Sequence, residues 1–145
     1  MKKVYFACSI AGGRDHAHVY QDIVNMIKGA GGQVLSELFA DTSLVSEVGT
    51  DPSITPSYIW QRDVDWVEQA DGIIAEVTQP SLGVGYEIAL AEKRHKPVLA
   101  LFYPRPGQRL SPMVSGNPHL QVVTYESVAE VRGVVENFVH NLSAK

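Results

Sequence analysis

Short, continuously apolar segments alternate along this chain with longer segments of helical character. The first apolar segment, Val4-Tyr5-Phe6-Ala7-Cys8, ends at Ser9 and a glycine pair, and a helical stretch from about His16 to Gly29 follows it. Uninterrupted runs of β-forming residues are typical of strands that are buried on both faces, as in parallel sheets covered by helices. The alternation therefore predicts an α/β fold.

The same pattern continues to the end of the chain. Further strands are expected at Gln33 to Glu37, Gly72 to Val77, Val98 to Tyr103 and Leu120 to Tyr125. Helices are expected at about Pro56 to Ala70, Gly83 to His95 and Glu126 to Leu142. Five strands joined in this way predict a doubly wound, flavodoxin-like (Rossmann-like) parallel sheet with strand order 2-1-3-4-5. Ligands bind such sheets at the carboxyl ends of the strands.

Size and charge narrow the function classes. With 145 residues and 45% hydrophobic content, residues 1–145 are expected to form one domain with an adequate core. Twelve Lys and Arg against sixteen Asp and Glu give a net charge of −4, which argues against a nucleic-acid partner. Apolar runs fall far short of the roughly 20 residues that span a bilayer, so no membrane partner is expected. The single cysteine, Cys8, fits a reducing, cytoplasmic location.

Two long connections interrupt the pattern: residues 41–57 are expected to be functional or mobile, and residues 104–118 are a candidate for substrate or subunit contacts. Residues 41–57 are rich in Ser, Thr, Asp, Gly and Pro, and residues 104–118 carry Pro, Gly, Arg and Ser. Connections of this length within a small domain are usually functional.

The predicted helix from Ser57 to Ala70 carries a carboxylate on its apolar face. Asp63 lies four residues after Ile59 and four before Val67, whereas Arg62 is placed on the opposite side of the helix. Desolvation of an unpaired charge is costly and raises the pKa of a carboxyl group. Asp63 is therefore either paired with an arginine or a neighbouring loop, or tuned as a general acid or base.

The segment Thr78-Gln79-Pro80-Ser81-Leu82-Gly83-Val84-Gly85-Tyr86-Glu87 joins the third strand to its helix. Gly83 and Gly85 allow close approach of a ligand, and Ser81 with the helix amino terminus offers donors to an anion. Glu87 is expected in the first helical turn, where the dipole favours its ionised form. An ionised carboxylate beside a phosphate-sized site suits nucleophilic attack on a sugar carbon. A glycine-rich turn with a glutamate that only balances the dipole is the alternative.

Asp63 and Glu87 together match the needs of glycoside cleavage. In that reaction one carboxylate attacks the anomeric carbon and another protonates the leaving group. Tyr5, in the first strand, is either a core tyrosine or a group whose hydroxyl orients a carboxylate. Ser9 and Gly12 follow the same strand at the same edge of the sheet.

Other chemistries find less support in the sequence. His16 and His18 are two residues apart and do not share a helix face, so no metal site is expected. Cys8 is interpreted as a small buried side chain. The chain has neither a Walker loop nor a complete dinucleotide-binding glycine motif after the first strand, so no cofactor is expected.

At these residues the sequence resembles the deoxynucleoside monophosphate N-hydrolases of the nucleoside 2-deoxyribosyltransferase family. The resemblance covers most of the chain, and its most specific part is the long match from Thr78 to Glu87. The matching segments are Val4 to Arg14, Gln61 to Trp66, Ala75 to Glu87 and Leu110-Ser111-Pro112-Met113.

The resemblance implies a single nucleoside deoxyribosyltransferase-like domain that acts as a homodimer without metal. It implies cleavage of a small-molecule deoxynucleoside monophosphate into free base and 2-deoxyribose 5-phosphate. Carried onto this chain, Glu87 is the nucleophile, through a covalent glycosyl intermediate, Asp63 the proton donor and Tyr5 the group that orients Glu87. The implied substrate-binding residues are Ser9, Ile10, Gly12, Ser81, Gly83, Gly85 and Ser111, with Ser111 contributed by the partner subunit across the interface.

Ala11 departs from the mammalian-type pattern, which has an arginine there; Arg14 or an arginine of residues 104–118 can substitute. Three alternatives stay open. They are a nucleoside 2-deoxyribosyltransferase that passes the sugar to a second base, a ribonucleotide N-hydrolase, and a non-catalytic nucleotide-sensing module on the same fold.

Overall fold

The central feature of the computed structural model is a parallel sheet. The structure describes residues 1–10, 14, 16–44 and 46–144. Its five strands are arranged in the order β2-β1-β3-β4-β5 and all neighbouring strands are parallel. They are β1 (Lys2–Ala7), β2 (Gly32–Val34), β3 (Gly72–Glu76), β4 (Val98–Phe102) and β5 (Gln121–Thr124). The predicted α/β class and strand order are therefore confirmed.

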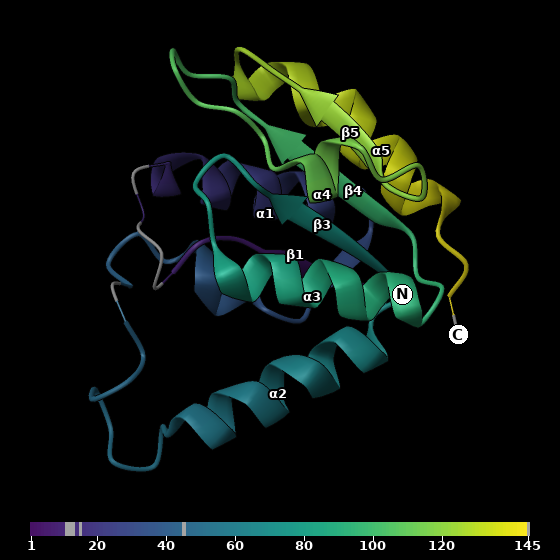
Figure 1. Cartoon of the computed structure of the whole chain (residues 1–145). Helices are drawn as coiled ribbons and strands as arrows, with labels where there is room; N and C mark the ends of the chain where they lie inside the picture. Colours follow the sequence, from purple (N-terminus) through teal and green to yellow (C-terminus); the bar gives the residue numbers. More distant parts are fainter. Residues whose placement is uncertain (11–13, 15, 45, 145) are drawn as a thin grey trace.

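Helices cover both faces of this sheet. Helices α2 and α3 lie on one face, and α1 and α5 pack together on the other (Figure 1). The helices are η1 (Ala17–Val19), α1 (Tyr20–Gly29), η2 (Glu37–Ala40), α2 (Pro56–Gln69), α3 (Leu82–Lys93), α4 (Pro112–Ser115), η3 (Val128–Val131) and α5 (Arg132–Asn141). Within the described part of the chain, none is long and apolar enough to cross a bilayer.

The core lies along the three inner strands of the sheet, β1, β3 and β4. Every residue of β3 and β4 is buried, as their continuous apolar sequences predict. The first two residues of β1 are partly buried, and its last four residues, from Val4 to Ala7, are buried completely. In the edge strand β5 the two end residues are exposed and the two middle residues are partly buried.

The second strand is shorter than predicted. The expected strand from Gln33 to Glu37 ends at Val34, and Glu37 instead begins η2. The reason is Ser36, whose hydroxyl accepts a bond from the Phe6 amide (2.9 Å) and donates to the Phe6 carbonyl (2.7 Å). Because the Ser36 side chain forms these bonds to the backbone of β1, the backbone pairing between β2 and β1 ends before Ser36.

The helix after β3 begins earlier than predicted. Its first residue is Leu82, and Ser81 caps it by accepting a bond from the Val84 amide at 3.3 Å. Glu87 is therefore the sixth helical residue, in the second turn, and its expected place in the first turn was wrong.

Candidate active site

A cavity of about 500 Å³ opens between α2 and α3 at the carboxyl edge of β1. Asp63 from α2 and Glu87 from α3 both line it, although they are far apart in sequence. Three further residues expected to bind substrate also line it, namely Ile10, Ser81 and Gly83. The fold thus brings the two predicted carboxylates and part of the predicted binding set to one place.

Glu87 is held by a tyrosine from the middle of the sheet. Tyr5 is fully buried in β1, and its hydroxyl donates a hydrogen bond to Oε2 of Glu87. Burial raises the pKa of Glu87 to about 8, the bond from Tyr5 acts to lower it, and the charge of Asp63 raises it. Burial also raises the pKa of Tyr5 well above its ordinary value, so this hydroxyl remains a donor.

Asp63 is mostly buried and has a cationic neighbour. Its side chain is 18% exposed, and its Oδ1 accepts a hydrogen bond from Nε of Arg62 at 2.9 Å. Burial raises the pKa of Asp63, and the Arg62 bond opposes that shift. Both interpretations of Asp63 therefore have support: it pairs with an arginine, and it faces the cavity that holds Glu87.

Arg62 itself was misplaced by the sequence pattern. Instead of facing solvent, its side chain is only 13% exposed, and its guanidinium forms a two-bond ion pair with Glu47, at 2.6 and 2.8 Å. It also lies over the rings of Trp66 and Phe39, at 4.7 and 5.6 Å from their centroids. A helical wheel gives the direction of Cβ, but a side chain as long as arginine can turn back around the helix.

Two aromatic residues flank the mouth of the cavity. Trp60 of α2 and Tyr86 of α3 line it and are about half exposed, and Nε1 of Trp60 donates to the Tyr86 hydroxyl at 3.3 Å. Within α2 only Val67 is buried, because Ile59, Trp60 and Val64 of its apolar face line the cavity. A planar ligand can stack against the apolar surface of these rings.

The predicted anion-binding residues differ in their surroundings. Ser9 is fully buried, and its hydroxyl has no hydrogen-bond partner among the described residues. The Ser81 hydroxyl accepts a bond as the α3 cap, which leaves its proton free to be donated. A Cβ added at Gly85 would meet no atom within 4 Å, so the space beside it is open. Gly12 lies outside the described residues.

Ser111 lies apart from the two carboxylates of its own chain. It caps α4 by accepting a bond from the Met113 amide at 3.2 Å. It lines a second cavity, of about 910 Å³, together with Gly85 and Ser81. Ser111 is not among the described residues that line the cavity of Asp63 and Glu87.

The described residues contain no cluster of three or more His, Cys, Asp or Glu side chains placed to hold a metal ion. Cys8 is buried, and burial raises the pKa of its thiol far above the ordinary value. Such a thiol is a poor nucleophile at neutral pH.

Comparison with protein families identifies the chain. Residues 4–136 match the model of the nucleoside 2-deoxyribosyltransferase family. The chain belongs to this family. Two similar relatives, from Tetraodon nigroviridis and Esox lucius, are both named 5-hydroxymethyl-dUMP N-hydrolase. The first is 43% identical over 141 residues, covering 96% of this chain and 98% of the relative. The second is 42% identical over 144 residues, covering 97% of each chain.

The fold of this nucleoside 2-deoxyribosyltransferase family member also occurs in a solved structure. The CMP N-glycosidase of Clostridium botulinum superposes with a TM-score of 0.65, covering 94% of this chain and 99% of that one. Sequence identity is 17%, so the likeness concerns the fold.

Proposed function

We propose that this family member hydrolyses the N-glycosidic bond of 2′-deoxynucleoside 5′-monophosphates, with free base and 2-deoxyribose 5-phosphate as products. The observation that carries the proposal is the meeting of Glu87, held by Tyr5, with Asp63 in one cavity. A pair of carboxylates with separate roles is what glycoside cleavage requires. The two relatives from Tetraodon nigroviridis and Esox lucius are named as N-hydrolases of a nucleotide of this class, which supports the same reaction.

In the first step the ionised Glu87 attacks the anomeric carbon of the deoxyribose. A bond forms between a Glu87 oxygen and that carbon while the carbon–nitrogen bond breaks, and its electron pair leaves with the base. Asp63 in its acid form gives the base a proton, which is why burial of this carboxyl is useful. The product of the step is a glycosyl ester on Glu87.

In the second step water replaces the enzyme on the sugar. Asp63, now ionised, accepts a proton from the water, whose oxygen bonds to the anomeric carbon. The ester bond to Glu87 breaks, and Glu87 leaves as a carboxylate that again accepts the Tyr5 hydroxyl. The enzyme returns to its starting state, and 2-deoxyribose 5-phosphate is released.

The 5′-phosphate is proposed to bind at the carboxyl edges of β1 and β3. Ser9 is a buried hydroxyl in need of a partner, and Ser81 stands at the amino terminus of α3, where backbone N–H groups favour an anion. Binding the phosphate there uses remote contacts to orient the reacting carbon toward Glu87.

The decisive experiment measures release of free base from a panel of deoxynucleotides, ribonucleotides and deoxynucleosides, with and without a second base. We expect release from deoxynucleoside monophosphates and much poorer release from deoxynucleosides. Formation of a new nucleoside from the second base would indicate transfer instead of hydrolysis. Binding without base release would indicate a nucleotide sensor.

Tyr5→Phe is expected to shift the pH dependence of catalysis upward. The Tyr5 hydroxyl favours the ionised form of Glu87, so its loss raises the pKa of Glu87 above the present value of about 8. A 2-deoxyribosyl 5-phosphate with a 4-nitrophenolate leaving group needs no proton from Asp63. The second ionisation of its phosphate lies near pH 6, below the pH range in which Glu87 ionises. With this substrate kcat/KM should rise with pH as Glu87 ionises. The pH at the midpoint of this rise should be higher in Tyr5→Phe than in wild type. An unchanged midpoint would contradict the orienting role.

The position of Ser111 leads to a proposal about assembly. We propose a homodimer in which Ser111 of the partner subunit completes each phosphate site, since Ser111 is outside the cavity of its own chain's carboxylates. Leu82 and Met113, which are almost fully exposed beside the second cavity, supply an apolar surface for that contact.

Mixing two inactive variants tests this assembly. Glu87→Gln lacks the nucleophile, and Ser111→Asp adds a charge that repels the phosphate. A heterodimer of the two holds one site with neither change, so exchange of subunits should restore activity toward about a quarter of the wild-type value at equal mixing, from simple counting of sites. Absence of recovery after proven subunit exchange would place Ser111 outside the partner's site.

A further inference from the structure

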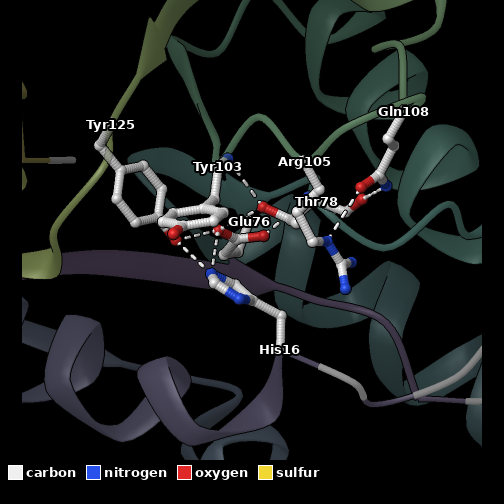
Figure 2. Close-up of polar contacts among 7 residues, drawn as sticks. All are labelled: His16, Glu76, Thr78, Tyr103, Arg105, Gln108 and Tyr125. Atoms are coloured by element: carbon white, nitrogen blue, oxygen red, sulfur yellow. Dashed lines mark hydrogen bonds and ion pairs between the residues drawn. The ribbon is translucent and has the colours of Figure 1, made fainter.

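A second buried carboxylate, Glu76, lies at the end of β3 on the sheet face opposite Tyr5. Glu76 is fully buried, and both its oxygens accept hydrogen bonds (Figure 2). Oε1 accepts the Thr78 amide at 2.7 Å, and Oε2 accepts the Thr78 hydroxyl at 2.9 Å. Oε2 also accepts the hydroxyl of Tyr125, which follows β5. Neither cavity described above is lined by Glu76.

The loop after β1 joins the same cluster through His16. Its Nε2 lies 2.7 Å from the Tyr125 hydroxyl oxygen and 3.5 Å from Oε2 of Glu76. The single hydroxyl hydrogen of Tyr125 forms the hydrogen bond to Glu76, so the Tyr125 oxygen is the acceptor toward His16. Nε2 of His16 therefore carries the hydrogen of this second bond. Burial lowers the pKa of His16 to about 4, which keeps the ring neutral near pH 7.

Thr78 extends the cluster to the connection after β4. Its hydroxyl oxygen accepts the Tyr103 amide at 2.9 Å, and its carbonyl accepts the side-chain amide of Gln108 (Figure 2). Gln108 in turn accepts Nε of Arg105 at 3.0 Å. One carboxylate thus connects the chain segments that follow β1, β3, β4 and β5.

Three of the four connected segments carry the proposed phosphate ligands. Ser9 and Ser81 would serve the chain's own site, and Ser111 would serve the site of the partner subunit. Ser9 precedes His16 in the connection after β1, Ser81 lies three residues beyond Thr78, and Ser111 lies three residues beyond Gln108. We propose that Glu76 is a positioning residue for the 5′-phosphate. Through Thr78, Tyr125 and His16, Glu76 sets the relative places of these segments. The inference rests on the proposed function.

Chemistry explains why a carboxylate is used at this place. An ionised carboxyl accepts the Thr78 amide, the Thr78 hydroxyl and the Tyr125 hydroxyl at once, whereas a glutamine has one oxygen and an amino group that can only donate. Burial is unfavourable for the charge and raises the pKa of Glu76 to about 7. An apolar residue would avoid that cost, so packing alone does not account for Glu76.

Glu76→Gln is expected to weaken use of the phosphate specifically. Two related substrates measure this effect: 4-nitrophenyl 2-deoxyriboside with and without its 5′-phosphate. The ratio of their kcat/KM values should fall by about tenfold or more, mainly through the KM of the phosphorylated compound, because misplacement by about 1 Å can cost on the order of 100-fold. Tyr125→Phe, which keeps the ring and removes one donor, should lower the ratio less.

Asp71→Asn is the matched control. Asp71 is also buried and accepts a backbone amide, that of Lys3 at 2.7 Å, but it lies just before β3 at the opposite edge of the sheet. This variant should lose stability and keep the substrate ratio within about twofold of wild type. A second readout is calorimetric binding of 2-deoxyribose 5-phosphate, which Glu76→Gln should weaken and Asp71→Asn should not.

The outcomes distinguish failure of the positioning role from failure of the proposed hydrolase activity. An unchanged ratio in folded Glu76→Gln, or in Tyr125→Phe if the first variant does not fold, overturns the positioning role and leaves the hydrolase intact. A ratio that falls equally in Asp71→Asn also overturns it, because the effect would then follow stability. A wild-type protein that cleaves neither substrate overturns the proposed function and this inference with it.

Discussion

Glu87→Gln is expected to lose nearly all turnover while the protein stays folded and binds nucleotide. A neutral amide cannot form the glycosyl ester, but its carbonyl oxygen can still accept the Tyr5 hydroxyl, so the local geometry survives. Covalent catalysts commonly lose several orders of magnitude on such a change. Base release is measured at high enzyme concentration, and nucleotide binding is measured by calorimetry on the same preparation.

Glu68→Gln is a suitable control for this variant. Glu68 is a partly exposed carboxylate on α2 that pairs with Arg94 at 2.6 Å. Its loss should leave turnover near the wild-type value, since exposed ion pairs contribute little. Retention of more than about a tenth of wild-type activity in Glu87→Gln would contradict its role as nucleophile.

Asp63→Asn is expected to have the second largest effect, and the size of that effect should depend on the leaving group. Natural bases need a proton to depart, and a general acid contributes roughly 10²- to 10⁴-fold where a proton must be delivered. The 4-nitrophenolate compound needs none, so it should be affected little. Rates with both substrates in single-turnover measurements test this difference.

The neighbouring Asp65→Asn separates local chemistry from helix damage. Asp65 lies two residues further along α2, is exposed, and accepts a bond from Gln61 at 2.9 Å. It should behave as wild type with both substrates. Equal losses for the two substrates in Asp63→Asn would indicate that Asp63 serves the Arg62 and Glu47 ion pair and has no part in proton delivery.

The backbone arrangement was predictable because its signals are local. Runs such as Val98 to Phe102 have no polar interruption, and a run of this short length is typical of a strand buried on both faces. Ser81 and Glu87 were recognised through one continuous segment for a similar reason. The predicted start of α3 at Gly83 is one residue late, because Ser81 caps the helix and Leu82 is its first residue.

Contacts between distant segments were not predictable from local patterns. The Glu47 to Arg62 pair depends on the path of a long connection, for which the sequence offers no period. Glu76 did leave a signal, since it is a carboxylate within the apolar segment from Gly72 to Val77. A charged side chain within an apolar pattern marks Glu76 on this strand in the same way as it marks Asp63 on its helix. Its partners Tyr125 and His16 come from other connections and had no such signal.

The buried carboxyl groups of Glu76 and Glu87 also couple folding to proton uptake. Burial raises the pKa of Glu76 to about 7 and that of Glu87 to about 8, above the ordinary value of 4.5 for glutamate. Each carboxyl therefore holds its proton more tightly in the folded chain, and unfolding releases protons between about pH 4.5 and pH 8. Their contribution to the free energy of unfolding is fully present below pH 4.5 and is lost as the pH rises through these folded-state values. The ionised form in which Glu87 would react is thus the form that the fold tolerates least.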